Sequence, residues 1–496
     1  MSETTQKTNR EILKKKRIFP PQGPLAGFRV LDFSQVLASP YLGTMLSDMG
    51  AEVIKVEASY GDSSRGYGPL KEGEAGYYIT QNRGKYGLCM DLTNPKAVEI
   101  CKELAKISDI LLENWRPGIM NKRGLGYDAI REINPGIIYA SVSGFGNFDR
   151  YAPAPGPYSP RLAYDVIAQA ESGHQWMNGF PDLAPHGLDV SWSDLNTGTH
   201  EAVAILAALI QRVKTGRGQW IDIALTDTMI ACNENLICMV SMAADDVPAP
   251  CRNGLRRLCI SPYGVFKAKD DYFVIGVDND KRFTRLCEAM GRPELARDPK
   301  FDTNHHRLEN RSQIEGIVEK WCSERTVEQC VRILRDEHSV PAGPILTNTG
   351  YVKHPHYRAR KMLVPIEQPR AGNFEINGVV SKLSRSPGMV QGAAPLMGEH
   401  NRHILKKYLG YSDKTIDNFT TSWSSWKTST WSMPTTLMSP GPKQKRKEGN
   451  CNETLCTGTT GRYQGSGSMR RSGGTLLRRH LVRSGRRGDQ GRKPRG

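Results

Sequence analysis

The 496-residue sequence predicts an α/β protein with a large parallel-sheet domain and a smaller α+β domain. From Phe28 onward, short apolar runs alternate with amphipathic stretches, which is the pattern of repeated strand–helix–strand units. After residue 228 the pattern changes to an isolated apolar run followed by charged amphipathic stretches, which indicates a second domain. A chain of this length can bury more than one hydrophobic core.

The first part of the large domain is assigned to residues 24–228. The predicted strands and helices alternate there, with strands at 29–33, 52–56, 110–112 and 137–141 and helices at 41–49 and 97–107. Crossovers between consecutive parallel strands place helices on both faces of a sheet, so this order predicts a Rossmann-like sheet.

A long apolar helix is predicted next, at residues 197–213, followed by a strand at 220–225. Gly216 lies between them, and glycine at a helix end adopts the left-handed backbone that stops the helix. The turn at 214–218 is therefore interpreted as a helix end rather than as a phosphate-binding loop.

The smaller domain is assigned to residues 229–335, with a strand at 272–277 and helices at 283–290 and 311–322. Residues 336–410 return to segments punctuated by proline and glycine and end in a helix near 401–409.

Both ends of the chain are basic. Residues 1–23 are expected to be flexible, and residues 411–496 hold 17 Lys and Arg against 5 Asp and Glu. The latter segment has too few apolar residues to offset its ordering entropy, so it is expected to be disordered. Residues 24–410 hold 45 Lys and Arg against 44 Asp and Glu, so the core does not indicate a nucleic-acid partner.

The 11 cysteines are scattered without paired metal-ligand spacing, so no metal site is expected. No signal peptide is recognised, and a cytoplasmic location is expected, with a mitochondrial transit peptide at 1–23 as the alternative. No run approaches the roughly 20 apolar residues that span a bilayer, so no membrane partner is expected.

Asp194 is the main candidate for a chemical role, because it comes just before the predicted helix 197–213. Aspartate is a preferred N-cap residue, so residue type alone favours a structural cap. The same place suits a carboxylate that stays ionised and faces a substrate, since free N–H groups and the helix dipole favour an anion there. The residues leave both interpretations open.

Six segments resemble the class III CoA-transferases, the family of formyl-CoA, oxalate and carnitine CoA-transferases and α-methylacyl-CoA racemase. They are residues 24–33, 50–57, 113–118, 143–146, 214–219 and 398–400. Each segment alone is weak, but six in the same order over most of the chain make the resemblance specific. It implies that residues 336–410 return to the large domain and that the subunit is ring-shaped and interlocks with a second copy as a homodimer.

The resemblance also implies transfer of CoA from an acyl-CoA to a small carboxylic acid, with no bound cofactor or metal and with CoA as part of the substrate. Asp194 would be the nucleophile, forming first an anhydride and then an enzyme thioester. An unperturbed aspartate is ionised at neutral pH and needs no partner base. The CoA-binding residues carried over are Leu37, Ala38, Met90, Asp91, Leu92, Thr93, Asn114, Trp115, Arg116, Lys122, Leu162, Ala163, Tyr164 and Asp165.

Several positions depart from relatives in this family. Tyr164 stands where the racemase branch has a catalytic histidine; tyrosine is a poor base near neutral pH, so transfer is favoured and racemisation stays the alternative. Ala58 stands where formyl-CoA transferase has a CoA-binding arginine, so Arg65, Lys122 or Lys55 is expected to supply that charge.

Further positions bear on the substrates. Leu37 replaces a glutamine of the formyl-CoA enzyme, and Arg256 and Arg257 either bind a second carboxylate or are solvated surface charges. Asp165 either lines the CoA site or bonds nearby backbone. The remote alternative is a non-catalytic protein that binds nucleic acid through its basic tail, residues 462–495.

Overall fold

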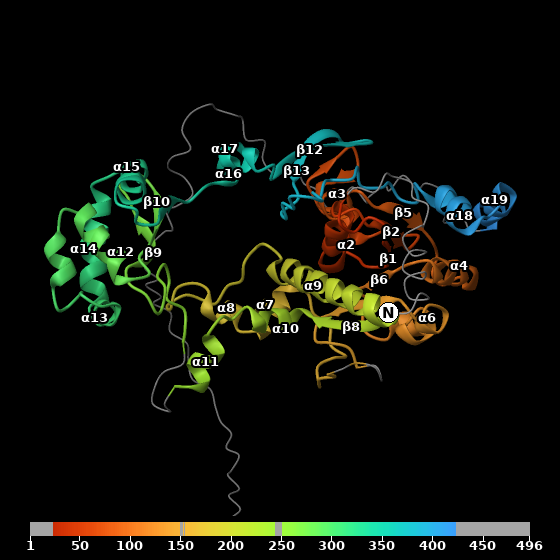
Figure 1. The fold of residues 1–496 in the computed structure, drawn as a ribbon, viewed down its shortest axis with the longest axis horizontal. Coiled ribbons are helices and arrows are strands. Elements are labelled where there is room, and N and C mark those ends of the chain that lie inside the picture. Colours follow the sequence, from red (N-terminus) through yellow and green to blue (C-terminus); the bar gives the residue numbers. More distant parts are fainter. Residues whose placement is uncertain (1–22, 149–151, 153, 244–249, 423–496) are drawn as a thin grey trace, which may run out of the picture. The chain divides into compact units, whose positions relative to one another are not determined.

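The computed structural model describes residues 23–148, 152, 154–243 and 250–422, which belong to one compact unit, residues 1–433. The basic segment 1–23, apart from its last residue, and most of the predicted tail lie outside the described residues. The α/β prediction is confirmed (Figure 1).

The centre of the fold is a six-stranded sheet in the order β5-β2-β1-β6-β7-β8, with every pair parallel. Its strands are β1 (Arg29–Asp32), β2 (Glu52–Glu57), β5 (Tyr86–Cys89), β6 (Ile110–Glu113), β7 (Ile138–Ser143) and β8 (Gln219–Ala224). The strand order reverses at β1, because the chain continues to β2 on one side and returns to β6 on the other. A crevice at the carboxyl ends of strands is expected at such a reversal.

Neighbouring residues of each strand enter different cores, as the two-residue period of a strand requires. Val30 and Ile110 pack under α2 (Ala38–Asp48) and α9 (Trp192–Thr215), whereas Leu31 and Leu111 pack in the core with α4 (Pro95–Lys106), α6 (Tyr127–Ile133) and α18 (Asn401–Leu409). Both faces of the sheet are thus covered by helices, and the predicted helices 41–49, 97–107 and 401–409 are confirmed within three residues at each end.

Helix α9 differs from its prediction at one end. It ends as expected, with Gly216 in the left-handed region at φ 73°. It begins at Trp192, five residues before the predicted start at 197. The polar run Ser193, Asp194 and Asn196, which resembles a capping segment in the sequence, therefore forms the first turns of the helix.

The smaller core is separate from the large sheet. An antiparallel sheet of β9 (Tyr263–Lys267), β10 (Tyr272–Gly276) and β11 (Ala342–Pro344) packs against α12 (Asp280–Ala289), α14 (Arg311–Ser323) and α15 (Val327–Val331). The predicted bounds 229–335 need correction at both ends. Met229 of α10 (Leu225–Ala231) packs with Val142 and Ala168 of the large domain, and β11 extends the smaller domain beyond 335.

Shorter elements complete the described chain. They are η1 (Ser63–Gly66), β3 (Leu70–Lys71), β4 (Glu74–Ala75), α3 (Gly76–Asn82), α5 (Ile119–Lys122), α7 (Asp165–Glu171), α8 (His174–Met177), α11 (Leu236–Ser241), η2 (Pro293–Arg297), α13 (Asn304–Glu309), η3 (Arg332–Glu337), α16 (Asn348–Lys353), α17 (Pro355–Ala359), β12 (Leu363–Gln368), β13 (Gly372–Asn377) and α19 (Asp413–Ser422).

Helix α19 corrects the expected start of the disordered tail at residue 411. Ile416 is buried in the core beside α4 and α18, and Arg402 of α18 forms an ion pair with Asp413 at 2.6 Å. The folded part of the chain therefore continues at least through residue 422. The basic residues 462–495 lie beyond the described part.

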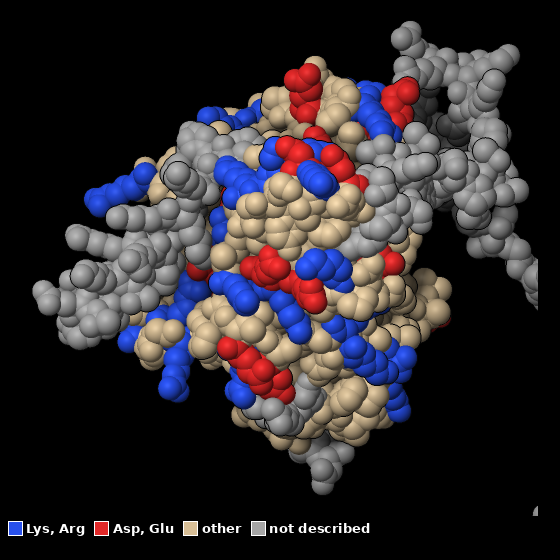
Figure 2. Space-filling view, turned by 90° about the vertical axis from the view of Figure 1, so that its right-hand side faces the viewer, with Lys and Arg blue, Asp and Glu red and all other residues tan. Residues whose placement is uncertain are grey.

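On the face in Figure 2, Lys and Arg side chains are interspersed with Asp and Glu. Such a mixed surface is expected from the near-equal counts of basic and acidic residues in 24–410. Within the described residues, no helix combines the length and the apolar character that a membrane span requires.

Candidate functional site

A pocket of about 690 Å³ opens where the strand order reverses, at the carboxyl ends of β1, β6 and β7. The strand ends and the segments after them supply its walls, together with α3, the start of α7 and the start of α9. The lining residues are Gln35, Val36, Leu37, Ala38, Tyr60, Ser63, Tyr67, Tyr77, Asn114, Trp115, Arg116, Pro117, Val142, Ser143, Gly144, Arg161, Leu162, Ala163, Tyr164, Asp165, Val166, Ser191, Asp194 and Leu225.

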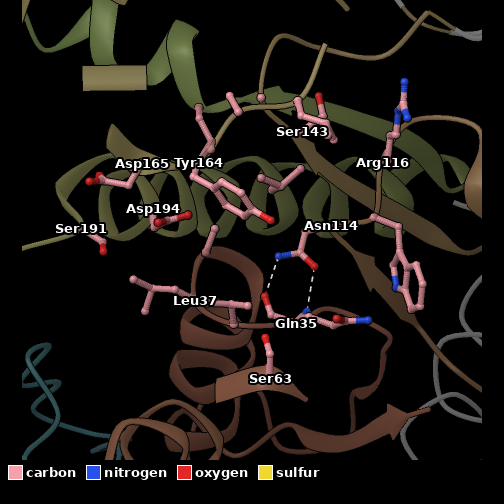
Figure 3. Close-up of a pocket in the computed structure, with 18 of the residues that line it drawn as sticks. Gln35, Leu37, Ser63, Asn114, Arg116, Ser143, Tyr164, Asp165, Ser191 and Asp194 are labelled. Atoms are coloured by element: carbon pink, nitrogen blue, oxygen red, sulfur yellow. Dashed lines mark hydrogen bonds between the residues drawn. The ribbon is translucent and has the colours of Figure 1, made fainter. Parts of the chain in front are cut away.

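The loop after β1 is fixed to the segment after β6. The Asn114 side chain accepts a hydrogen bond from Gln35 N at 2.7 Å and donates one to Gln35 O at 2.8 Å (Figure 3). These two bonds join the segments that follow the neighbouring strands β1 and β6 at the wall of the pocket.

Val36 in the same loop has a φ of 64°, which is strained for a β-branched residue. The Asp62 carboxylate accepts a hydrogen bond from Val36 N at 3.2 Å and forms an ion pair with Lys55 at 3.0 Å. Burial opposes ionisation of Asp62, but the Lys55 ammonium and hydrogen bonds from Ser64 lower its pKa to about 2. A permanently charged Asp62 therefore holds the strained loop in place.

The cations near Ala58 are all engaged within the protein or lie outside the pocket. Lys55 is fully buried with Asp62, and Arg65 pairs with Glu57 at 2.6 Å. Lys122 is exposed and does not line the pocket. The expectation that one of these three replaces the arginine absent at position 58 therefore finds no support in the geometry.

Asp194 is the third residue of α9 and faces the pocket (Figure 3). No side chain caps this helix from the N-cap position, Ser191, and α9 starts before Asp194, so Asp194 is not its N-cap. Burial and, next, the negative charge of Asp165 raise the pKa of Asp194 to about 7. This carboxyl group is therefore far more basic than the unperturbed aspartate assumed from the sequence.

Asp165 lies beside Asp194 in the pocket wall (Figure 3). One of its carboxylate oxygens accepts a hydrogen bond from Ser193 N at 2.8 Å, and the other accepts one from Gln169 Nε2 at 2.6 Å. The contacts of Asp165 within the protein are those of an acid that bonds nearby backbone, one of the two interpretations left open by the sequence.

Tyrosines form another part of the wall. Tyr67 and Tyr77 pack edge to face with ring centroids 5.4 Å apart. Burial and then the Asp194 carboxylate raise the pKa of Tyr77, so its hydroxyl stays protonated as a hydrogen-bond donor near Asp194. Sequence reasoning missed both residues, because nothing in the local pattern of 67–77 indicates that it folds over the strand ends.

Two arginines supply the positive charge of the pocket. Arg116 lies at the opposite end from Asp165 and Asp194 (Figure 3) and donates to Pro160 O at 3.4 Å. Arg161 stacks on the Tyr158 ring, with its guanidinium carbon 3.4 Å from the ring centroid. Within the described residues neither forms an ion pair, so both guanidinium groups are available to an anionic ligand.

The pocket brings together Asp194 and most of the predicted CoA-binding residues. Those that line it are Leu37, Ala38, Asn114, Trp115, Arg116, Leu162, Ala163, Tyr164 and Asp165. Those that do not are Met90, Asp91, Leu92, Thr93 and Lys122. Met90 and Leu92 follow β5 and are buried in the hydrophobic core. The Asp91 carboxylate accepts hydrogen bonds from Thr93.

Arg256 and Arg257 lie on the smaller domain and do not line the pocket. Arg256 is paired with Glu315 at 3.1 Å and also with Glu319, and Arg257 is paired with Glu234. Both charges are already balanced within the chain, which favours the structural interpretation over binding of a substrate carboxylate. Within the described ranges, no cluster of His, Cys, Asp and Glu could hold a metal ion.

Comparison with known proteins gives concordant results. The sequence model of "CoA-transferase family III" matches residues 25–401. The chain is 35% identical to human "Succinyl-CoA:glutarate CoA-transferase" over 79% of this chain and 88% of that protein. It is 37% identical to "Acetyl-CoA:oxalate CoA-transferase" of Acetobacter aceti over 78% of this chain and 96% of that protein.

The fold is also similar to that of a solved structure, a CAIB/BAIF family protein from Brucella suis. The TM-score is 0.67 at 33% sequence identity, with 78% of this chain and 100% of that chain covered.

Proposed function

Because the chain belongs to CoA-transferase family III and is a CoA-transferase, we propose that it moves CoA from an acyl-CoA to a small dicarboxylic acid with Asp194 as nucleophile. One observation carries the proposal: Asp194, whose pKa is raised to about 7, lines the same pocket as Arg116 and Arg161, which form no ion pair with any described residue. The names of the relatives, which include glutarate and oxalate as acceptors, support the dicarboxylic acid.

In the first step, an Asp194 oxygen attacks the thioester carbonyl carbon and the carbon–sulfur bond breaks, giving a mixed anhydride and CoA thiolate. The thiolate then attacks the Asp194 side of the anhydride, which releases the donor acid as a carboxylate and leaves CoA bound to Asp194 as a thioester. The acceptor carboxylate repeats both steps in reverse and regenerates the Asp194 carboxylate. No step needs a proton, oxidant or reductant.

Each oxyanion formed on the way needs hydrogen-bond donors close to Asp194. The Tyr77 hydroxyl in the pocket wall is one such donor, because its raised pKa keeps it protonated. Asp194 itself must be ionised to attack, so the reaction depends on a group with a pKa of about 7.

The other end of the pocket suits the phosphates of CoA. Arg116 and Arg161 present guanidinium groups without carboxylate partners among the described residues, and guanidinium matches phosphate geometry. These two residues, rather than Lys55, Arg65 or Lys122, would supply the charge missing at Ala58.

A homodimer is part of the proposal. Helix α9 leaves Val203, Ile210 and Val213 exposed at 65%, 60% and 49%, and Ile230 of α10 is exposed at 43%. A run of exposed branched aliphatics on one helix is typical of a surface that another chain covers. Sedimentation of the full chain should give a mass of two subunits. The cytoplasmic location also stays a proposal.

The function is tested with the full-length protein, succinyl-CoA as donor and glutarate, oxalate, malonate and acetate as separate acceptors. A new acyl-CoA should appear by mass spectrometry with at least one dicarboxylic acid. Asp194→Asn should lower turnover at least about 1000-fold, as loss of a nucleophile does. Asp227→Asn is the matched control, since Asp227 is the third residue of α10 and does not line the pocket.

Trapping locates the covalent residue. Hydroxylamine added during turnover should modify the peptide that contains Asp194, and modification of another acid would refute the assignment. The racemase alternative predicts exchange of the α-hydrogen of a 2-methylacyl-CoA in heavy water, with no new acyl-CoA. A binding protein without activity would give neither product.

A further inference from the structure

We propose that Asp165 is a positioning residue for Asp194: its carboxylate holds the first turn of the helix that carries Asp194, and its charge faces that of Asp194. This inference rests on the proposed role of Asp194 as the nucleophile. It assigns Asp165 a function in the chemical step rather than the contact with CoA expected from the sequence.

The first turn of α9 is capped from another helix. Ser193 is the second residue of α9, and its N–H is one of the groups without an acceptor inside the helix. The N-cap residue, Ser191, makes no side-chain cap bond. Asp165 on α7 accepts the hydrogen bond from Ser193 N at 2.8 Å instead, so the backbone directly before Asp194 is fixed by Asp165.

Gln169 extends this contact to the segment that leads into α9. It lies one turn after Asp165 on α7 and donates to the second Asp165 oxygen at 2.6 Å. The side-chain oxygen Oε1 of Gln169 accepts a hydrogen bond from Leu188 N at 2.9 Å, and its Nε2 also donates one to Leu188 O at 3.3 Å. Asp165 and Gln169 therefore hold Leu188 and Ser193, on both sides of the α9 start.

The arrangement also sets the electrostatic surroundings of Asp194. A helix start normally stabilises an anion through its free N–H groups and dipole. Here Asp165 uses one of those N–H groups and brings a second negative charge close to Asp194. Burial and the Asp165 charge together raise the pKa of Asp194 to about 7, which makes its ionised form a stronger nucleophile.

Other ionisable groups around the pocket do not replace this interaction. Tyr77 on α3 lines the same pocket and stays protonated. The remaining titratable lining groups are Tyr60, Tyr67, Arg116, Arg161 and Tyr164. Among the described residues, burial and the charge of Asp165 are what raise the pKa of Asp194. The acid limb of the pH–rate profile therefore reports the charge of Asp165.

Two substitutions separate the hydrogen bond from the charge. Asp165→Asn removes the charge but keeps an oxygen that can accept from Ser193 N, whereas Asp165→Ala removes both. Asn94→Ala is the matched control, because Asn94 accepts a hydrogen bond from Lys96 N, the second residue of α4, at 2.9 Å and does not line the pocket.

We expect Asp165→Asn to lower the apparent pKa of the acid limb of kcat/KM by about one unit or more, since an adjacent like charge is lost. Asp165→Ala should show the same shift and a further fall in kcat of about 10-fold or more from misplacement of Asp194. Asn94→Ala should lower the melting temperature without moving the acid limb. Dissociation constants for the acyl-CoA should stay close to that of the parent protein in all three variants.

An unchanged acid limb in Asp165→Asn overturns the inference. So does a raised dissociation constant for acyl-CoA with kcat and the acid limb unchanged, which would make Asp165 a CoA contact. Hydroxylamine trapping on the parent protein keeps the two proposals apart. Modification elsewhere than Asp194 refutes the proposed nucleophile whatever the Asp165 variants show.

Discussion

Replacing Asp194 by Asn should stabilise the protein, and more so as the pH rises. The folded protein holds the pKa of Asp194 at about 7, whereas the reference value for an unfolded chain is 3.8. Below pH 3.8 both states bind the proton and the group has no effect. Between these two pH values the unfolded chain releases the proton whereas the folded protein keeps it. The free energy of unfolding therefore falls as the pH rises from 3.8 towards 7.

The three-unit difference corresponds to about 4 kcal/mol of destabilisation above pH 8 and about 2 kcal/mol at pH 5. Asn at this position has no charge to bury. Any free-energy cost of burying the Asn side-chain amide in this variant does not depend on pH, so it cancels when the stabilities at the two pH values are compared. The advantage of Asp194→Asn over the parent protein should therefore grow by about 2–3 kcal/mol between pH 5 and pH 8.5.

Urea unfolding of both full-length proteins at these two pH values measures this growth directly. Asp182→Asn is the control, because Asp182 is exposed and does not line the pocket, and it should change stability by less than about 0.5 kcal/mol at both pH values. A pH-independent difference between Asp194→Asn and the parent would show that Asp194 is not held neutral by its surroundings. The expected dependence of the reaction rate on a group with a pKa of about 7 would then also be refuted.

Two further predictions concern the pocket and the chain end. The double variant Arg116→Ala, Arg161→Ala should raise KM for an acyl-CoA about 10-fold or more. It should leave KM for the matching acyl-pantetheine unchanged, because only CoA carries phosphates. Equal effects on the two substrates would contradict the assignment of these arginines to the phosphates. Truncation after Ser422 should leave the melting temperature unchanged, whereas truncation after Tyr411 removes buried Ile416 and should cost about 2–3 kcal/mol; equal melting temperatures would refute this.

Much of the fold follows from local sequence patterns. Strands such as β1 and β6 alternate between two apolar cores, as at Val30 and Leu31, and that alternation is visible without a structure. The sequence prediction places the start of α9 too late, because Ser193, Asp194 and Asn196 are all residues that favour caps. The hydrogen bond that Ser193 N donates to Asp165 on another helix cannot be recognised in the sequence. Helix α19 was missed because Ile416 is one of few apolar residues in a polar segment.

The electrostatics of the site could not be predicted from residue types. Lys55 and Arg65 have the sequence appearance of free cations near Ala58, yet each forms an ion pair with an acid of the same segment, Asp62 and Glu57, which the order of residues alone does not specify. Arg161 is adjacent to predicted site residues but gains its importance only because no described carboxylate reaches it. Charge balance depends on which side chains meet in space, and sequence spacing does not specify that.

The raised pKa of Asp194 has a consequence for the proposed reaction itself. In the free enzyme, the ionised carboxylate is a partly buried charge beside Asp165, and no cation among the described residues forms an ion pair with it. Formation of the anhydride converts Asp194 into a neutral group and moves the charge to the CoA thiolate, and formation of the thioester moves it on to the donor carboxylate, which is released. The destabilised free carboxylate thus favours the covalent intermediates, and acyl exchange gains from the same burial that weakens the fold at high pH. The enzyme thioester should accordingly accumulate more at pH 8 than at pH 6 when no acceptor is present, and its amount should fall in Asp165→Asn.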